Sequence, residues 1–215
     1  MSVRGVAWMA LVFGLTLLAG LPARWVSKAV PWPVEGVSGS VWRGQAVRVG
    51  AVGPLSWRVR PWAAQVQAGY QAQRWSIELA GWPWAWQATL IPSGPTRSVA
   101  VGYRLSGEWQ GQLQVRGAGR RCRTAAGQVW ADDLALVAPW SLALGRGEVR
   151  VECSEGLKVL AQLGLAGQHQ VTLQAGIAGA TLEGQVEQGA AVYPVLVGGQ
   201  WLAQGSEQLR RTFRW

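Results

Sequence analysis

Residues 74–79 read RWSIEL and alternate polar with apolar side chains at every step. Successive side chains of a β-strand point to opposite faces, so this order places Trp75, Ile77 and Leu79 on one face and polar side chains on the other. Strands of antiparallel sheets commonly bury one face and expose the other in this way. The stretch therefore predicts a half-buried β-strand.

The same alternation recurs along the chain, at residues 98–105, 109–115, 169–174 and 182–187. Glycine-containing turns separate these stretches, and glycine supplies the positive φ that tight hairpins require. From about residue 34 onward the pattern lacks the long helical crossovers that parallel strands need. We predict a mainly β protein, with one antiparallel, rolled or sandwiched sheet over 34–215 and a joint between two halves at 90–96. A short helix is expected at 139–144 or 207–212.

The N-terminal segment 6–23 carries no charge over 18 residues, which is just long enough to cross a bilayer as a helix. A cleaved signal peptide is the rival interpretation, but Leu21-Pro22-Ala23 is a poor cleavage site. The prediction is a cytoplasmic tail at 1–5, a single transmembrane anchor at 6–23, a linker at 24–33 and a periplasmic domain beyond.

The chain has two cysteines, Cys122 and Cys153, which are 31 residues apart and form no C-x-x-C motif. This spacing suits a structural disulfide better than a metal site or a redox pair, and closing such a loop contributes about 3–4 kcal/mol to stability. A disulfide requires an oxidising compartment and so favours a location outside the cytoplasm. The alternative is two unrelated buried thiols.

The sequence offers no recognisable catalytic constellation. The single histidine, His169, shares a strand face with Val171 and Leu173, where a core residue is far more common than a base. Asp132 and Asp133 are adjacent and would point to opposite faces of a strand, so they could not share a proton. We therefore expect no enzymatic activity, no cofactor, no metal and no nucleic-acid ligand, and a small-molecule ligand is not favoured.

Two groups of residues form a candidate partner surface. Residues 81–87, GWPWAWQ, would place Trp82, Trp84 and Trp86 on one face of a strand, either as a wall of the core or as a grip for a sugar, a base or an apolar partner. Pro83 favours an edge strand, because proline cannot donate to a sheet ladder. The stretch RGAGRRCR adds a basic group of four arginines, Arg116, Arg120, Arg121 and Arg123. Outside the cytoplasm its partners would be anionic lipids or acidic proteins. The alternative is a solvated turn that keeps the protein soluble.

Two blocks of the sequence resemble the type II secretion system protein N family of Gram-negative bacteria. They are GVSGSVWRGQAVRVG, after the apolar segment, and GPLSWRVRPW, and the matching residues are Gly36, Gly39, Trp42, Gly44, Leu55, Trp57, Arg58 and Pro61. The surroundings of the two cysteines also fit. The resemblance implies a single-pass inner-membrane protein whose periplasmic β domain accompanies the platform subunits, without catalytic activity. It further implies that Gly36 and Gly39 are turn positions and that Trp42 anchors a strand against Trp57.

A second class of function stays open, because rolled sheets anchored at the inner membrane also serve as periplasmic lipid carriers. A continuous open apolar trough would favour a carrier, whereas a filled core with a polar rim would favour a scaffold. Carbohydrate binding through the tryptophans would require their exposure beside polar neighbours.

Overall fold

The computed structural model describes residues 3–27, 33–96, 102–154 and 156–215. Its N-terminal part holds two helices and four short strands, α1 (Val3–Ala19), α2 (Ala23–Ser27), β1 (Val34–Glu35), β2 (Ser38–Gly39), β3 (Arg43–Ala46) and β4 (Arg48–Val49). Longer strands follow, β5 (Leu55–Arg60), β6 (Ala63–Tyr70), β7 (Gln73–Trp82), β8 (Ala85–Pro95), β9 (Arg104–Ser106), β10 (Gln110–Ala118) and β11 (Arg121–Ala138). The chain ends with β12 (Leu142–Glu152), β13 (Lys158–Leu165), β14 (His169–Gly176), β15 (Gly179–Val186), α3 (Tyr193–Gly198) and β16 (Gln208–Arg214).

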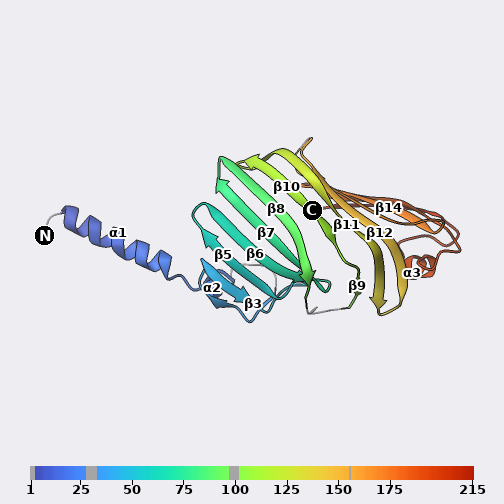
Figure 1. Ribbon diagram of the computed structural model, residues 1–215, viewed down its shortest axis with the longest axis horizontal. Helices are drawn as coiled ribbons and strands as arrows, with labels where there is room; N and C mark the ends of the chain where they lie inside the picture. The colour runs from blue at the N-terminus through green and yellow to red at the C-terminus, as the bar shows by residue number, and fades with distance from the viewer. Residues whose placement is uncertain (1–2, 28–32, 97–101, 155) are drawn as a thin grey trace.

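Nearly all the strands belong to one antiparallel sheet, in the order β2-β3-β5-β6-β7-β8-β10-β11-β12-β13-β14-β15-β16 (Figure 1). Strand β9 pairs with β11, and β1 pairs with β4 outside the main sheet. The prediction of a mainly β, antiparallel protein is therefore confirmed. Residues 90–95, the proposed joint, belong to β8, which pairs with β7 along this stretch and with β10 through residues 86–90.

The short helix expected within the domain lies at neither of the two places that the sequence suggested. Residues 142–144 belong to β12 and residues 208–212 to β16, because both stretches continue the ladder of their neighbours. The helix found in this region is α3, with Pro194 in its first turn, where a missing N–H does no harm.

The predicted anchor over 6–23 is not one helix. Helix α1 ends at Ala19, and Pro22 forms an isolated bridge to Ser40 of the β domain before α2 begins at Ala23. Proline cannot continue a helix without losing a backbone hydrogen bond, which explains the break. Among the residues that the structure describes, no helix is both long enough and apolar enough to cross a membrane.

The alternation read from the sequence produces two chemically different sheet faces. Strand register aligns the apolar positions in cross-strand rows, Trp57–Val66–Ile77–Leu90–Leu113 on one half of the sheet and Val129–Val149–Ala161–Leu173–Leu182 on the other. The opposite face carries Arg58, Gln65, Glu78 and Thr89 in the corresponding row. We call the sheet face that carries the two apolar rows the apolar face.

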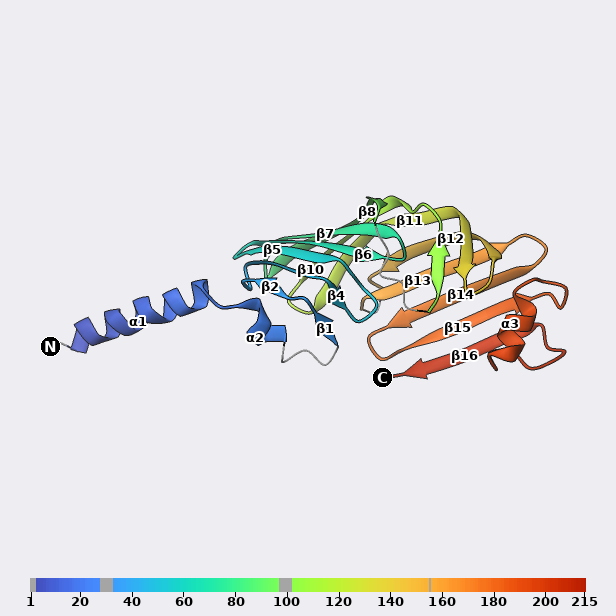
Figure 2. The same ribbon diagram turned by 90° about the horizontal axis from the view of Figure 1, so that it is seen from below.

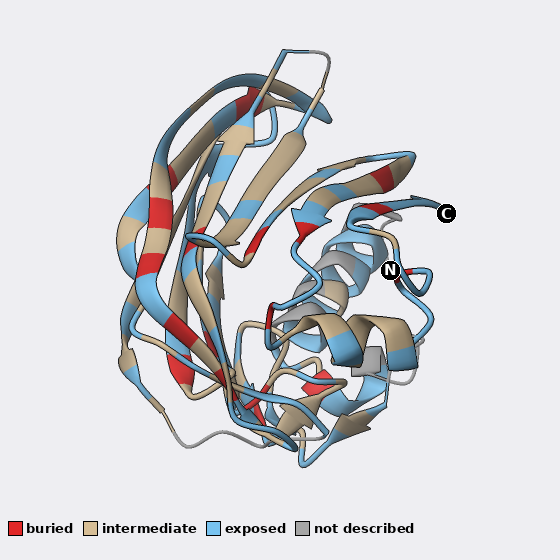
Figure 3. Ribbon diagram, turned by 90° about the vertical axis from the view of Figure 1, so that its right-hand side faces the viewer, coloured by how far each residue is buried: buried red, intermediate tan, exposed pale blue. Residues whose placement is uncertain are grey.

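The apolar face is the concave side of the sheet and is covered at both ends. The sheet bends into an arc, and α3 lies inside that arc near the C-terminal strands (Figures 2 and 3). There Leu196 and Val197 of α3 pack with Val171 and Leu182 around a buried cluster that includes Leu209. At the other end the Trp57 indole donates to backbone oxygens of the segment that leads into β3.

The apolar face is unevenly buried within the described residues. On β7, Ile77 and Leu79 are 39% and 42% exposed, whereas Leu113 on β10 and Val129 on β11, in the middle of the sheet, are 5% and 2% exposed. The accessible surface of the chain is 14435 Å², whereas a compact protein of 23.1 kDa exposes about 9,700 Å². The projecting helix α1 accounts for part of this excess, and the uncovered face contributes to the rest.

Two strand glycines lie under the rings of tryptophans on neighbouring strands. Trp57 lies over Gly44 on the neighbouring strand, and Trp86 lies over Gly117, so that a Cβ at either glycine would overlap the indole ring. An aromatic ring lying over a strand glycine shields backbone that has no side chain of its own. The pairing lets large rings lie flat where the sheet bends.

Candidate functional site

The residues that carry the family resemblance fold against one another. Gly44 of β3 pairs with Trp57 of β5, and the Trp57 Nε1–H lies 3.2 Å from the Ser40 oxygen and 3.1 Å from the Val41 oxygen. The backbone N–H of Val59 donates to the Trp42 oxygen. Two sequence blocks thus form one structural unit at the N-terminal end of the sheet.

The glycines of this unit adopt backbone conformations that favour glycine. Gly36 has φ of 63° and Gly39 has φ of 90°. Gly36 lies in a bend, as predicted, but Gly39 is part of β2 and the turn follows it at residues 40–42. Trp42 lies in that turn rather than in a strand, because the Ser40 N–H closes the turn onto the Arg43 oxygen. Leu55 begins β5, and Pro61 lies in the turn after it.

The predicted disulfide is present. Cys122 and Cys153 are bonded with their Cα atoms 5.4 Å apart. Cys122 lies near the start of β11, and Cys153 follows the last residue of β12. The bond therefore ties the turn between β10 and β11 to the connection between β12 and β13.

The three tryptophans of the candidate partner surface do not share one strand face. Trp82 is the last residue of β7, Pro83 and Trp84 form the hairpin turn, and Trp86 belongs to β8. The prediction of an edge strand is wrong because Pro83 occupies the turn, where no ladder hydrogen bond is lost. The Trp82 and Trp84 rings stack with centroids 5.3 Å apart and planes 5° apart, while Trp86 lies over Gly117.

The structure brings these tryptophans next to the predicted arginines. Gly117 pairs with Trp86, and the Trp86 Nε1–H donates to the Gly119 oxygen at 3.0 Å. Arg116 donates to the Gln87 side chain at 3.1 Å, and Arg120, Arg121 and Arg123 are exposed. Sequence reasoning missed Trp62 in the adjacent β5–β6 turn, which is 54% exposed. The repeated dipeptide Pro61-Trp62 and Pro83-Trp84 is the signal that could have revealed it.

An apolar pocket opens beside these turns and adjoins the apolar face. It has a volume of about 370 Å³, and its walls include Val59, Ala64, Leu79 and Trp86, with Arg60 at its margin. Val59, Ala64 and Leu79 are cross-strand neighbours on the apolar face. The pocket is therefore the end of the apolar face at this edge of the sheet.

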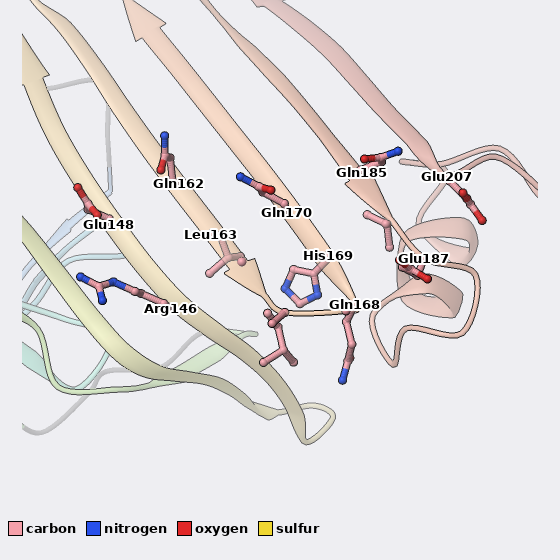
Figure 4. A pocket seen from close by; sticks show the side chains of 15 residues that line it. Arg146, Glu148, Gln162, Leu163, Gln168, His169, Gln170, Gln185, Glu187 and Glu207 are labelled. Atoms are coloured by element: carbon pink, nitrogen blue, oxygen red, sulfur yellow. The ribbon is translucent and has the colours of Figure 1, made fainter.

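A second pocket, of about 410 Å³, lies on the opposite, polar face near the C-terminal strands. Figure 4 shows Glu148, Gln162, Gln170 and Gln185 along four neighbouring strands, with His169 beyond them. Glu148 is paired with Arg150. This arrangement is a row of polar side chains with no two of them held at a common reaction centre.

His169 lies in register with Val171 on β14, as the sequence predicted, and is only 7% exposed. Its Nε2 is 3.1 Å from the Leu144 oxygen and donates to it, and the buried Nδ1 has no hydrogen-bond partner among the described residues. Asp132 and Asp133 are both exposed, and Asp132 lies 3.4 Å from Arg146. Within the described ranges, no three His, Cys, Asp or Glu side chains gather closely enough to hold a metal ion.

Comparisons with protein-family profiles, with curated proteins and with solved structures found no match to this chain. The resemblance drawn from residues 36–61 and from the cysteine surroundings thus remains a prediction.

Proposed function

We propose that this chain is a non-enzymatic accessory subunit of a type II secretion system, held at the inner membrane with its β domain in the periplasm. The observation that carries the proposal is the assembly of the family-like residues into one unit. Gly44 lies under Trp57, and Trp57 is bonded to the backbone that precedes β3.

The disulfide supports the compartment. Cys122 and Cys153 form a bond that persists only where the environment is oxidising, as the periplasm is. Side chains of α1 support an attachment to the membrane, since Trp8, Phe13 and Leu17 are apolar and at least half exposed. Exposed apolar side chains on a helix favour burial in lipid.

The β domain offers a secretion platform two kinds of surface rather than a reaction centre. Its outer sheet face is polar, and the uncovered apolar face would bury an apolar segment of a partner. Contacts of this kind would position platform subunits without chemical change in either partner.

Deletion of the gene should reduce the secreted amount of the cognate exoproteins and leave them in the periplasm. Complementation by the wild-type gene should restore secretion, and complementation by Trp57→Ala should not, because that change removes the ring which covers Gly44. Platform subunit levels measured by immunoblot distinguish loss of assembly from loss of export. Unchanged secretion and unchanged platform levels in the deletion strain would refute the proposal.

The exposed part of the apolar face favours a second candidate function, which is the binding of lipid acyl chains. Ile77 and Leu79 on β7 of this face are 39% and 42% exposed, and Leu79 lines the pocket of about 370 Å³. Burying ten methylene groups of an acyl chain there would contribute about 8 kcal/mol before the costs of association. That is enough for micromolar affinity at most.

Native mass spectrometry of the purified protein tests the second candidate. A lipid carrier should retain phospholipid, and Ile77→Asp should abolish retention because it places a charge on the apolar face. Ser76→Asp is the matched control, since it adds the same charge to the neighbouring position on the polar face. Equal retention by all three proteins, or by none, would reject acyl-chain binding on this face.

A further inference from the structure

Three hairpin turns distant in sequence lie side by side along one edge of the sheet. They join β5 to β6, β7 to β8 and β10 to β11, at residues 61–62, 83–84 and 119–120. The Gly81 N–H donates to the Trp62 oxygen at 2.9 Å, and the Gly119 N–H donates to the Pro83 oxygen at 2.6 Å. These hydrogen bonds fix the turns relative to one another, and the disulfide at Cys122 secures the third.

The turns expose aromatic side chains. Trp62, Trp82 and Trp84 are 54%, 49% and 67% exposed. Indole rings are amphipathic, and when they are not in a protein core they are enriched where an apolar phase meets water. Their concentration on neighbouring turns is therefore a property of this edge and not a consequence of core packing.

The same edge is basic. Five exposed arginines lie on or beside the turns, Arg60, Arg116, Arg120, Arg121 and Arg123. None of them forms an ion pair with a residue that the structure describes. The stretches 58–64, 80–88 and 115–125 contain no aspartate or glutamate. We call the three turns with these tryptophans and arginines the tryptophan–arginine rim.

The opposite edge of the sheet has a different character. There Arg48 is paired with Glu35 and Arg146 with Asp132, whereas Arg74 and Arg104 are exposed and form no ion pair with a described residue. The rim combines five exposed arginines that form no ion pair with a described residue, three exposed indoles and the apolar pocket of about 370 Å³. This combination points to an anionic and partly apolar partner at the rim.

We propose that the tryptophan–arginine rim docks on an anionic phospholipid bilayer. The arginines bind the phosphate groups, the indoles lie among the headgroups, and the rim pocket faces the acyl region. A bilayer supplies anionic charge next to hydrocarbon, and Arg60 lines the same pocket as Val59, Ala64 and Leu79. This inference goes beyond the secretion role, and its test involves no secretion.

A fluorescent probe on single added cysteines of the full-length protein tests the docking. The environment-sensitive dye NBD is attached at Ala85→Cys, on the rim, or at Ala166→Cys, in the β13–β14 turn at the opposite edge; both positions are exposed. Labelling without reductant leaves the native disulfide intact. Vesicles of phosphatidylglycerol and phosphatidylethanolamine should shift the emission at position 85 to the blue and leave position 166 unchanged. Vesicles of phosphatidylcholine alone should shift neither.

Charge-reversal variants make the vesicle-binding test quantitative. A basic residue near an anionic surface changes binding about fivefold, so Arg120→Glu with Arg121→Glu should raise the vesicle concentration for half the shift at least about 25-fold. Arg74→Glu with Arg104→Glu, near the opposite edge, changes the net charge equally and should have little effect. Circular dichroism verifies the fold of each variant.

Three results would overturn the proposal. An equal shift at positions 85 and 166 would indicate adsorption through another part of the chain. The absence of any shift at position 85 on anionic vesicles would show that the rim does not meet lipid. A shift with polyglutamate but not with vesicles would reassign the rim to an acidic protein partner.

Discussion

The difference between Leu79 and Leu113 gives a sharp test of whether the apolar face is open at β7. Both leucines lie on that face, Leu79 on β7 and Leu113 on β10, yet Leu79 is 42% exposed and Leu113 is 5% exposed. Fully burying a leucine contributes about 1.5–3 kcal/mol, so Leu79, which is little more than half buried, contributes about 1–1.5 kcal/mol. Truncating it opens no cavity, because its surroundings already reach solvent.

Leu79→Ala should therefore lower the free energy of unfolding by about 1 kcal/mol. Leu113→Ala should lower it by about 2–5 kcal/mol, since truncation of a buried leucine leaves a cavity. Urea unfolding of the protein after removal of bound lipid, monitored by tryptophan fluorescence, measures the free energy of unfolding of both variants. A loss at Leu79 equal to that at Leu113 would mean that the face is a closed core, and the reasoning about an open surface would fail.

Three further changes test other parts of the structure. Cys122→Ser with Cys153→Ser should lower the free energy of unfolding by about 3–4 kcal/mol in urea, and an unchanged unfolding midpoint would contradict a structural role. Gly39→Ala should lower the melting temperature more than Gly50→Ala. Both glycines have positive φ, but only at Gly39 would a Cβ overlap the backbone. Equal melting temperatures of the two variants would refute this. Trp57→Phe should cost about 1 kcal/mol through the lost Nε1 hydrogen bonds, and calorimetry that detects no change would show these bonds to be unimportant.

The alternation of residues such as Trp75, Ile77 and Leu79 was sufficient to predict the antiparallel sheet and the side of each strand that is apolar. It could not reveal whether that side is covered, because a closed core and an open concave face have the same period of two. The distinction depends on how far the sheet bends and on what lies inside the arc, such as α3. These are properties of the whole chain and not of a local pattern.

The errors at the tryptophan cluster and the anchor have local physical causes. The spacing of Trp82, Trp84 and Trp86 is that of one strand face. However, Pro83 and Trp84 form a turn, because the fixed φ of proline favours a turn position. The apolar segment 6–23 reads as continuous by composition, but Pro22 ends the helical path before the segment is complete. The pairing of Cys122 with Cys153 was predictable, because the chain offers no other pair.

The feature of the candidate site that was hardest to predict is which hairpin turns lie next to one another across the sheet. Trp62, Trp84 and Arg120 come from three hairpins, and only strand order places their turns at one edge. Once the order is known, the apposition follows, since alternate turns of an antiparallel sheet lie at the same edge.

Secretion in a strain that lacks this gene tests the central claim most directly. The amounts of the cognate exoproteins are measured in the medium and in the periplasm, with the deletion strain and its complemented derivative compared under the same conditions. A type II accessory subunit predicts exoproteins retained in the periplasm of the deletion strain and released again on complementation. Exoproteins released normally from the deletion strain, together with phospholipid bound to the purified protein, would contradict the secretion role and assign the chain to lipid binding.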